Sequence, residues 1–209
     1  MSYYFYKIHN FNINNAKHIL DFSIRHINKN MEINNELFSK DIRRKLFKKL
    51  QKINEYYSSF IKIDYKAELK NFLQRIKNSQ DEPDFDEKLI SYMIIIHEEL
   101  YRQTPRLIQI ISLLYYLEGY KEKYGLILEV LTGEGKTLTI SFLALYLSIL
   151  GNKVDILTSS PVLAERDAKS REKFFNYFGI SCDFCRNDSN KNLLRNKGNM
   201  FECYKEDIV

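Results

Sequence analysis

Two glycines one residue apart are followed by a lysine and a threonine, at Gly133, Gly135, Lys136 and Thr137. The usual phosphate-loop pattern is G-x-x-x-x-G-K-[ST], and Val130 stands here in place of its first glycine. Because glycine has no Cβ, a polyphosphate can approach the backbone N–H groups of such a loop. We expect the lysine to bind the β- and γ-phosphates and the threonine hydroxyl to bind Mg²⁺. The spacing therefore predicts a site for a nucleoside triphosphate with magnesium.

Apolar segments on both sides of the loop would position it. Residues 126–131 (LILEVL) are typical of a buried strand, and residues 137–150 of a buried helix whose N-terminus faces the phosphates. Strands alternate with helices in the remainder, which predicts a partial parallel sheet covered by helices on both faces. Nucleotide would then bind beyond the C-terminal ends of the strands. Besides 126–131, the predicted strands are 153–160, 180–185 and 207–209, and a helix is predicted over 161–178.

The chain before residue 104 has helical periodicity and no catalytic constellation. Apolar residues recur every three or four positions and predict helices over 38–60, 65–76 and 85–100. Asp84 and Glu87 have the spacing of a capping box for the third of these helices.

Two further features lie near residue 104, where the helical first part of the chain meets the predicted α/β part. Thr104 and Pro105 form an N-cap and N1 pair for a further helix, and His97 is interpreted as a core histidine rather than a ligand. We therefore expect an α/β chain with an asparagine-rich arm (1–35), a helical lead-in segment (36–103) and a nucleotide-binding domain (104–209).

Composition and charge are those of a globular protein and argue against nucleic-acid binding. The hydrophobic share of 44% is enough for a sizeable core, and a net charge of +5 is modest for 209 residues. Seven basic residues between Lys40 and Lys52 could bind nucleic acid or anionic lipid, but no aromatic recognition motif accompanies them. We favour a solvated helix face there, so we expect no nucleic-acid partner.

Cysteines and hydropathy point to a cytoplasmic protein. Cys182 and Cys185 form a C-x-x-C pair without a nearby fourth ligand, which favours reduced thiols over zinc. The first residues lack the pattern of a secretory signal, and the longest apolar stretch is too short to span a bilayer.

Three segments in order, TGEGKTLTI, VDILTSSPVLAERDA and YFGISC, resemble the first nucleotide-binding domain of the SecA preprotein translocase ATPases. These are superfamily 2 motors with a RecA-type, DEAD-like helicase domain, and the resemblance covers roughly residues 100–209. The segment TPRLIQ resembles the adenine-reading Q motif, which places the amide of Gln109 against the base. The resemblance implies that ATP and Mg²⁺ are bound by Gln109, Thr132, Gly133, Glu134, Gly135, Lys136, Thr137 and Arg166, with Thr137 on the metal.

The same resemblance implies a motor that couples ATP binding and hydrolysis to protein translocation or remodelling. Its partners would be a protein substrate or translocation channel and the remainder of the motor. Peripheral contact with a membrane would also fit the resemblance. Such motors also need paired carboxylates on a later strand and arginines from a second domain. Asp155 and Asp207 would lie at the wrong ends of their strands for this role. If these residues are the whole molecule, we expect little or no hydrolysis, and a nucleotide-binding interaction module without turnover remains the alternative.

Overall fold

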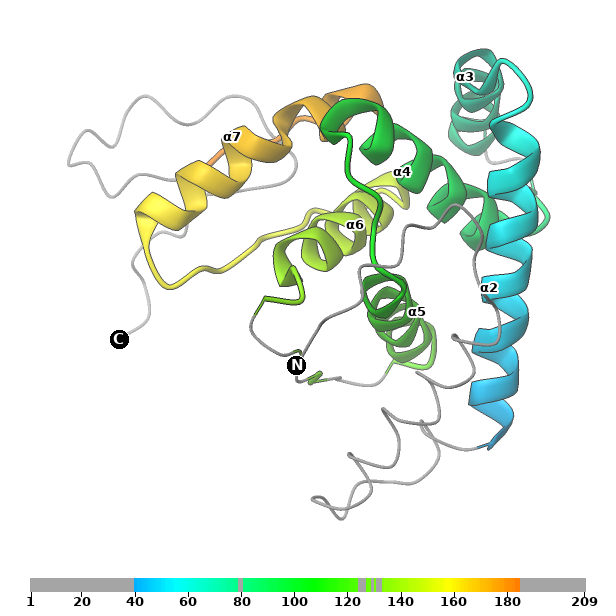
Figure 1. Cartoon of the computed structure of the whole chain (residues 1–209). Coiled ribbons are helices and arrows are strands. Elements are labelled where there is room, and N and C mark those ends of the chain that lie inside the picture. The colour runs from blue at the N-terminus through cyan, green and yellow to red at the C-terminus, as the bar shows by residue number, and fades with distance from the viewer. Residues whose placement is uncertain (1–39, 79–80, 124–126, 129, 131–132, 185–209) are drawn as a thin grey trace. The chain divides into compact units, whose positions relative to one another are not determined.

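A computed structural model describes residues 40–78, 81–123, 127–128, 130 and 133–184 (Figure 1). All regular secondary structure within these ranges is helical. The chain divides into two compact units, the first ending at Thr139 and the second beginning at Ile140. The helices are α2 (Lys40–Phe60), α3 (Tyr65–Lys77), α4 (Phe85–Tyr101), α5 (Leu107–Lys121), α6 (Lys136–Ile149) and α7 (Pro161–Tyr177).

The predicted asparagine-rich arm lies outside the described residues, but the three helices predicted after it are confirmed as α2, α3 and α4. Helix α2 packs on α4 and α5 through one apolar face. The ring of Phe60 stacks on that of Tyr92 with centroids 4.3 Å apart, and Phe72 of α3 lies 5.3 Å from the same ring. The α2 side chains buried in this core are Leu46, Leu50, Ile53, Tyr57 and Phe60, spaced three or four residues apart as the periodicity predicts.

The capping box predicted at Asp84 and Glu87 is wrong. Asp84 has a left-handed backbone, with φ of 55°, and its side chain makes no cap hydrogen bond. Its carboxylate instead accepts hydrogen bonds from Lys52 Nζ at 2.6 Å and from the Tyr56 hydroxyl at 3.0 Å. The Asp84 carboxylate thus binds two side chains of α2 instead of the α4 backbone.

The basic run of α2 is only partly a solvated face, which corrects the sequence interpretation. Lys49 is 12% exposed, and its ammonium lies 2.7 Å from Asp86 Oδ2 and 2.9 Å from Glu118 Oε1. Lys45 contacts the other oxygen of Glu118 at 2.5 Å, and Lys121 contacts Asp86. Burial opposes the charge of Glu118, but hydrogen bonds from both α2 lysines outweigh it and hold the pKa of this carboxyl below its ordinary value. These five residues form a charge cluster that joins α2, α4 and α5.

His97 is a core residue, as the sequence predicts. Its side chain is buried, and Nδ1 lies 2.8 Å from the carbonyl oxygen of Gln103. Since a carbonyl can only accept, Nδ1 carries the proton. The imidazole therefore ties the end of α4 to the connection that leads into α5.

The predicted parallel sheet is wrong for the described residues. None of residues 127–128, 130, 153–160 or 180–184 lies in a strand, and 207–209 fall outside the described part of the chain. A strand requires a neighbour that pairs with its N–H and C=O groups, and these segments form no such ladder. Ile127 and Leu157, assigned to the interior by the pattern, are 97% and 75% exposed. An apolar run signals burial but does not supply the pairing partner.

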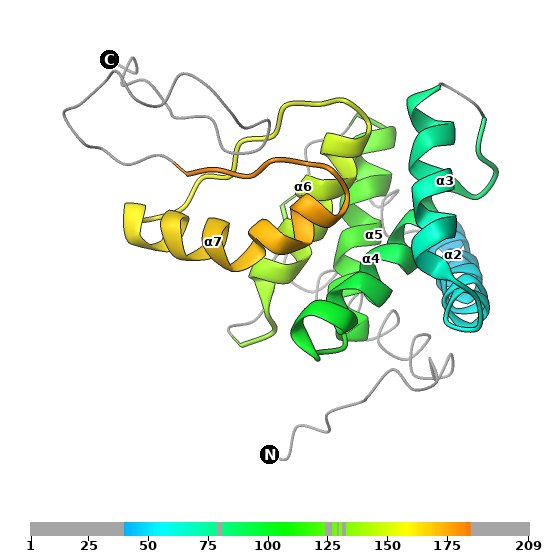
Figure 2. The ribbon, with the colours of Figure 1, turned by 90° about the horizontal axis from the view of Figure 1, so that it is seen from above.

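The second unit confirms the helix predicted after residue 160. The Ser160 hydroxyl caps α7 by accepting a hydrogen bond from the Leu163 backbone N–H at 3.3 Å, and Pro161 occupies the first turn. Phe142 of α6 stacks on Phe174 of α7 with ring centroids 5.3 Å apart. Figure 2 shows residues 180–184, in orange, running back along α7, where Cys182 Sγ lies 3.8 Å from the Ala168 carbonyl oxygen.

Candidate functional site

The loop before α6 has the backbone geometry that glycine permits. Gly133 and Gly135 have φ values of 89° and 76°, a region that other residues rarely adopt. Gly135 also needs its small size, because a Cβ there would lie 2.3 Å from Gln109 Nε2. A Cβ on Gly133 would meet nothing within 4 Å. Positive φ therefore favours glycine at both positions, and small size is a second requirement at Gly135 alone.

The amide of Gln109 holds the loop from the first turn of α5. Its Nε2 donates to the carbonyl oxygens of Glu134 at 2.8 Å and Gly135 at 3.1 Å. Its Oε1 accepts a hydrogen bond from the backbone N–H of Arg106 at 2.8 Å. This last bond caps the helix, so α5 begins at Leu107, two residues after the start that Thr104 and Pro105 predict.

Arg106 holds the same loop from the residue before α5. Its Nη1 donates to the Gly133 carbonyl oxygen at 3.0 Å and to Glu134 Oε2 at 3.0 Å. The sequence interpretation did not identify this residue. These contacts span 27 and 28 positions along the chain, and no local pattern signals them. The only available sign was a cation three residues before Gln109.

Three consecutive loop carbonyls, those of Gly133, Glu134 and Gly135, are thus bound by the start of α5. The described peptide bonds are all trans, and in a trans peptide the C=O and N–H point in opposite directions. The N–H groups of Glu134, Gly135 and Lys136 therefore face away from α5. Successive N–H groups directed to one side form an anion-binding concavity of the kind that receives phosphate.

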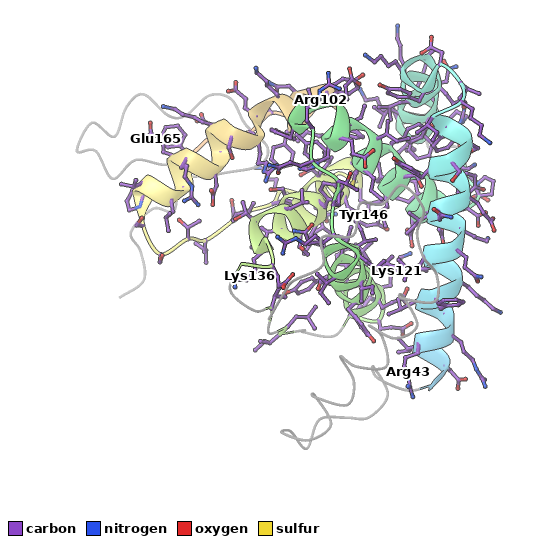
Figure 3. The ribbon with its side chains drawn as sticks, in the orientation of Figure 1. Arg43, Arg102, Lys121, Lys136, Tyr146 and Glu165 are labelled. Carbon is purple, nitrogen blue, oxygen red and sulfur yellow. The ribbon has the colours of Figure 1, made fainter. Side chains whose placement is uncertain are left out.

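Lys136, which Figure 3 labels, begins α6, and Thr137 follows it in the first turn. The helix dipole favours an anion there. The Lys136 ammonium donates to the Val130 carbonyl oxygen at 2.9 Å across the loop, and its side chain is exposed. A neutral carbonyl is a weaker partner for an ammonium than a phosphate oxygen. The Thr137 hydroxyl would suit Mg²⁺, since oxygen ligands are the ones that this ion prefers.

The remaining predicted site residues fall elsewhere. Thr132 lies outside the described residues. Arg166 belongs to α7 in the second unit, where its Nε and Nη2 donate to Asp167 Oδ1 at 2.9 and 2.8 Å. A contact of Arg166 with nucleotide stays a prediction. Within the described residues no three acidic, histidine or cysteine side chains gather as a metal site.

Comparisons with known proteins give one matching family and several similar sequences. Residues 27–209 match the family described as the SecA DEAD-like domain. The chain is 36% identical over 105 residues to the protein translocase subunit SecA of Mycoplasmoides gallisepticum, covering 50% of the chain and 11% of that relative. It is 34% identical over 146 residues to the protein translocase subunit SecA of Rickettsia prowazekii, covering 66% of the chain and 15% of that relative. The chain thus spans a small part of the length of these relatives. Among the described helices, none combines the length and the hydropathy that a transmembrane span needs.

Proposed function

Because the chain belongs to the SecA DEAD-like domain family, we propose that it forms the nucleotide-binding part of a SecA-like motor and binds ATP with Mg²⁺ at the loop before α6. The observation that carries this proposal is the set of loop carbonyls held by Gln109 and Arg106. Since these carbonyls turn toward α5, we expect the N–H groups of the same peptides to turn toward a bound anion. Preformed donors bind phosphate without paying for loop ordering.

Each residue of the loop has a role in this proposal. The N–H groups of Glu134, Gly135 and Lys136 receive the phosphates, and the Lys136 ammonium exchanges the Val130 carbonyl for phosphate oxygens. The Thr137 hydroxyl binds Mg²⁺, which neutralises part of the polyphosphate charge.

Gln109 is the residue that we expect to read the base. Both hydrogens of its Nε2 are directed to loop carbonyls, while Oε1 accepts from Arg106 and retains a second lone pair. The exocyclic amino group of adenine can donate to that lone pair without disturbing the loop. Guanine presents a carbonyl oxygen at the same position, which would face Oε1 as a second acceptor. Recognition of the base is thereby linked to the geometry of the phosphate loop.

The activity of the complete motor is a second part of this proposal, and the relatives suggest it. The matched proteins are translocase subunits, and we propose that this chain contributes nucleotide binding to a motor that moves or remodels a protein substrate. A translocation channel and the remaining motor domains would be its partners.

Calorimetric titration of the 209-residue chain with MgATP and MgGTP tests the proposed base recognition. Wild type should bind ATP more tightly than GTP by at least about tenfold, the size of one mismatched buried hydrogen bond. The variant Gln109→Ala should lose most of that preference, and Gln103→Ala, at an exposed glutamine in the same connection, should retain it. Equal preference in wild type and Gln109→Ala would refute the assignment of Gln109.

A further inference from the structure

The phosphate loop contains a carboxylate where an anion is to bind. Glu134 lies between the two glycines, and its backbone N–H is one of the three directed away from α5. A carboxylate free to turn toward the bound polyphosphate would repel it, because like charges a few ångströms apart interact unfavourably even near a protein surface. The site therefore needs a means of keeping this side chain away from the nucleotide.

Arg106 supplies that means. Its Nη1 lies 3.0 Å from Glu134 Oε2 and 3.0 Å from the Gly133 carbonyl oxygen, so one group binds both the carboxylate and the backbone beside it. The Gly133 carbonyl is on the α5 side of the loop, opposite the N–H groups. The Glu134 carboxylate is consequently held on that side as well, with its charge balanced. The pair is half-exposed, with side chains 44% and 23% accessible, so it remains open to solvent and salt.

We propose that Arg106 is a positioning residue of the nucleotide site, which holds and neutralises Glu134 on the α5 side so that polyphosphate meets the loop N–H groups alone. This inference rests on the proposed nucleotide binding and adds to it. Arg106 acts through Glu134, because reaching the phosphates directly would require its guanidinium to release the Gly133 carbonyl and cross to the other side of the loop. The ligand that it favours is a polyphosphate, and its effect should increase with the charge of the ligand.

A double-mutant cycle in the full 209-residue chain tests this role by calorimetry with MgATP. Arg106→Leu should weaken binding about tenfold by releasing the Glu134 carboxylate. The same substitution in a Glu134→Gln background should weaken binding less than about threefold, since no carboxylate is left to repel the phosphates. Arg44→Leu removes an equal charge from an exposed arginine of α2 and should leave the affinity unchanged.

Salt provides a second measurement, which a purely structural role would not affect. The Debye length falls from about 10 Å at 0.1 M salt to about 3 Å at 1 M. The ratio of wild-type to Arg106→Leu affinity should therefore approach one at high salt. Circular dichroism of each variant confirms that the fold is retained, and Arg106→Lys, which keeps the charge, should recover part of the lost affinity.

The outcomes separate this inference from the nucleotide site itself. An equal loss for Arg106→Leu in both backgrounds would show that Arg106 does not act through Glu134, but through the Gly133 carbonyl or by direct contact with nucleotide. No loss in either background would show that Glu134 needs no partner. Both results overturn the proposal while wild type still binds MgATP. Absence of MgATP binding by wild type would instead refute the proposed function.

Discussion

Gly133 and Gly135 show how a single loop uses one residue type for two purposes. Both adopt positive φ, which costs a residue with a Cβ about 1 kcal/mol. Only at Gly135 would a Cβ also collide with the Gln109 amide, 2.3 Å away. That amide is buried and makes two hydrogen bonds to the loop, so moving it would release the carbonyls of Glu134 and Gly135.

Alanine substitutions at the two glycines separate these effects. Gly133→Ala should lower the free energy of unfolding by about 1 kcal/mol, and Gly135→Ala should lower it further, because its Cβ also displaces Gln109; denaturant titration measures both. Gly135→Ala should in addition weaken MgATP binding more than Gly133→Ala, because it displaces Gln109. In a Gln109→Ala background the two variants should bind alike. A persistent difference there would mean that the Gln109 contact is not what makes Gly135 necessary.

Sequence patterns pointed to part of the candidate site and missed Arg106 for a definable reason. The spacing of a phosphate-loop pattern predicted Gly133, Gly135 and Lys136, and the resemblance of TPRLIQ to a Q motif predicted Gln109; their binding roles stay predictions. Arg106 acts through contacts with residues 27 and 28 positions away, and only the folded chain brings these together. Arg106 lies three residues before Gln109, but this spacing does not reveal that both side chains bind consecutive loop carbonyls.

At the scale of the helix, α5 connects the phosphate loop to the charge cluster of the first unit. Gln109 lies in its first turn, and Glu118 lies near its end between Lys45 and Lys49 of α2. Glu118 is 1% exposed, so its charge depends on these partners. The position of α5 along α2, and with it the position of Gln109, is thereby fixed by ion pairs as well as by apolar packing.

Removing the charge of Glu118 should destabilise the first unit. We expect Glu118→Gln to lower the free energy of unfolding by about 2 kcal/mol at pH 7, since Lys45 and Lys49 lose a shared carboxylate. Asp41→Asn, which breaks the exposed pair with Arg44, should change it by less than about 0.5 kcal/mol. Urea titrations of the three proteins provide the comparison.

The pH dependence of that difference has a defined sign. The folded-state pKa of Glu118 is lower than its unfolded value, so its contribution is fully present above the ordinary pKa of a glutamate. The contribution is lost as pH falls from that value through the lower folded-state pKa. The difference in free energy of unfolding between wild type and Glu118→Gln should therefore become smaller in acid. A gap that stays constant below pH 4 would contradict the ionised assignment of Glu118.

For the molecule as a whole, helices were predictable and the sheet was not. The period of apolar residues in α2 and α4 reports directly on which face is buried, because a helix forms its backbone hydrogen bonds within itself. The apolar runs around residues 127–130 and 153–160 report only a tendency to be buried. A strand also depends on a partner elsewhere in the chain, and the described residues of these runs have no ladder.

Whether MgATP binds to the 209-residue chain decides whether the loop before α6 is a phosphate site. Calorimetry should detect binding by wild type that requires Mg²⁺ for full affinity, and Lys136→Ala should weaken it by at least about tenfold, the loss of a charge-assisted bond to phosphate. Lys62→Ala removes an exposed lysine in the turn after α2 and serves as the control for charge. Equal affinity of wild type and Lys136→Ala, or no binding by wild type, would contradict the assignment of this loop as the phosphate site.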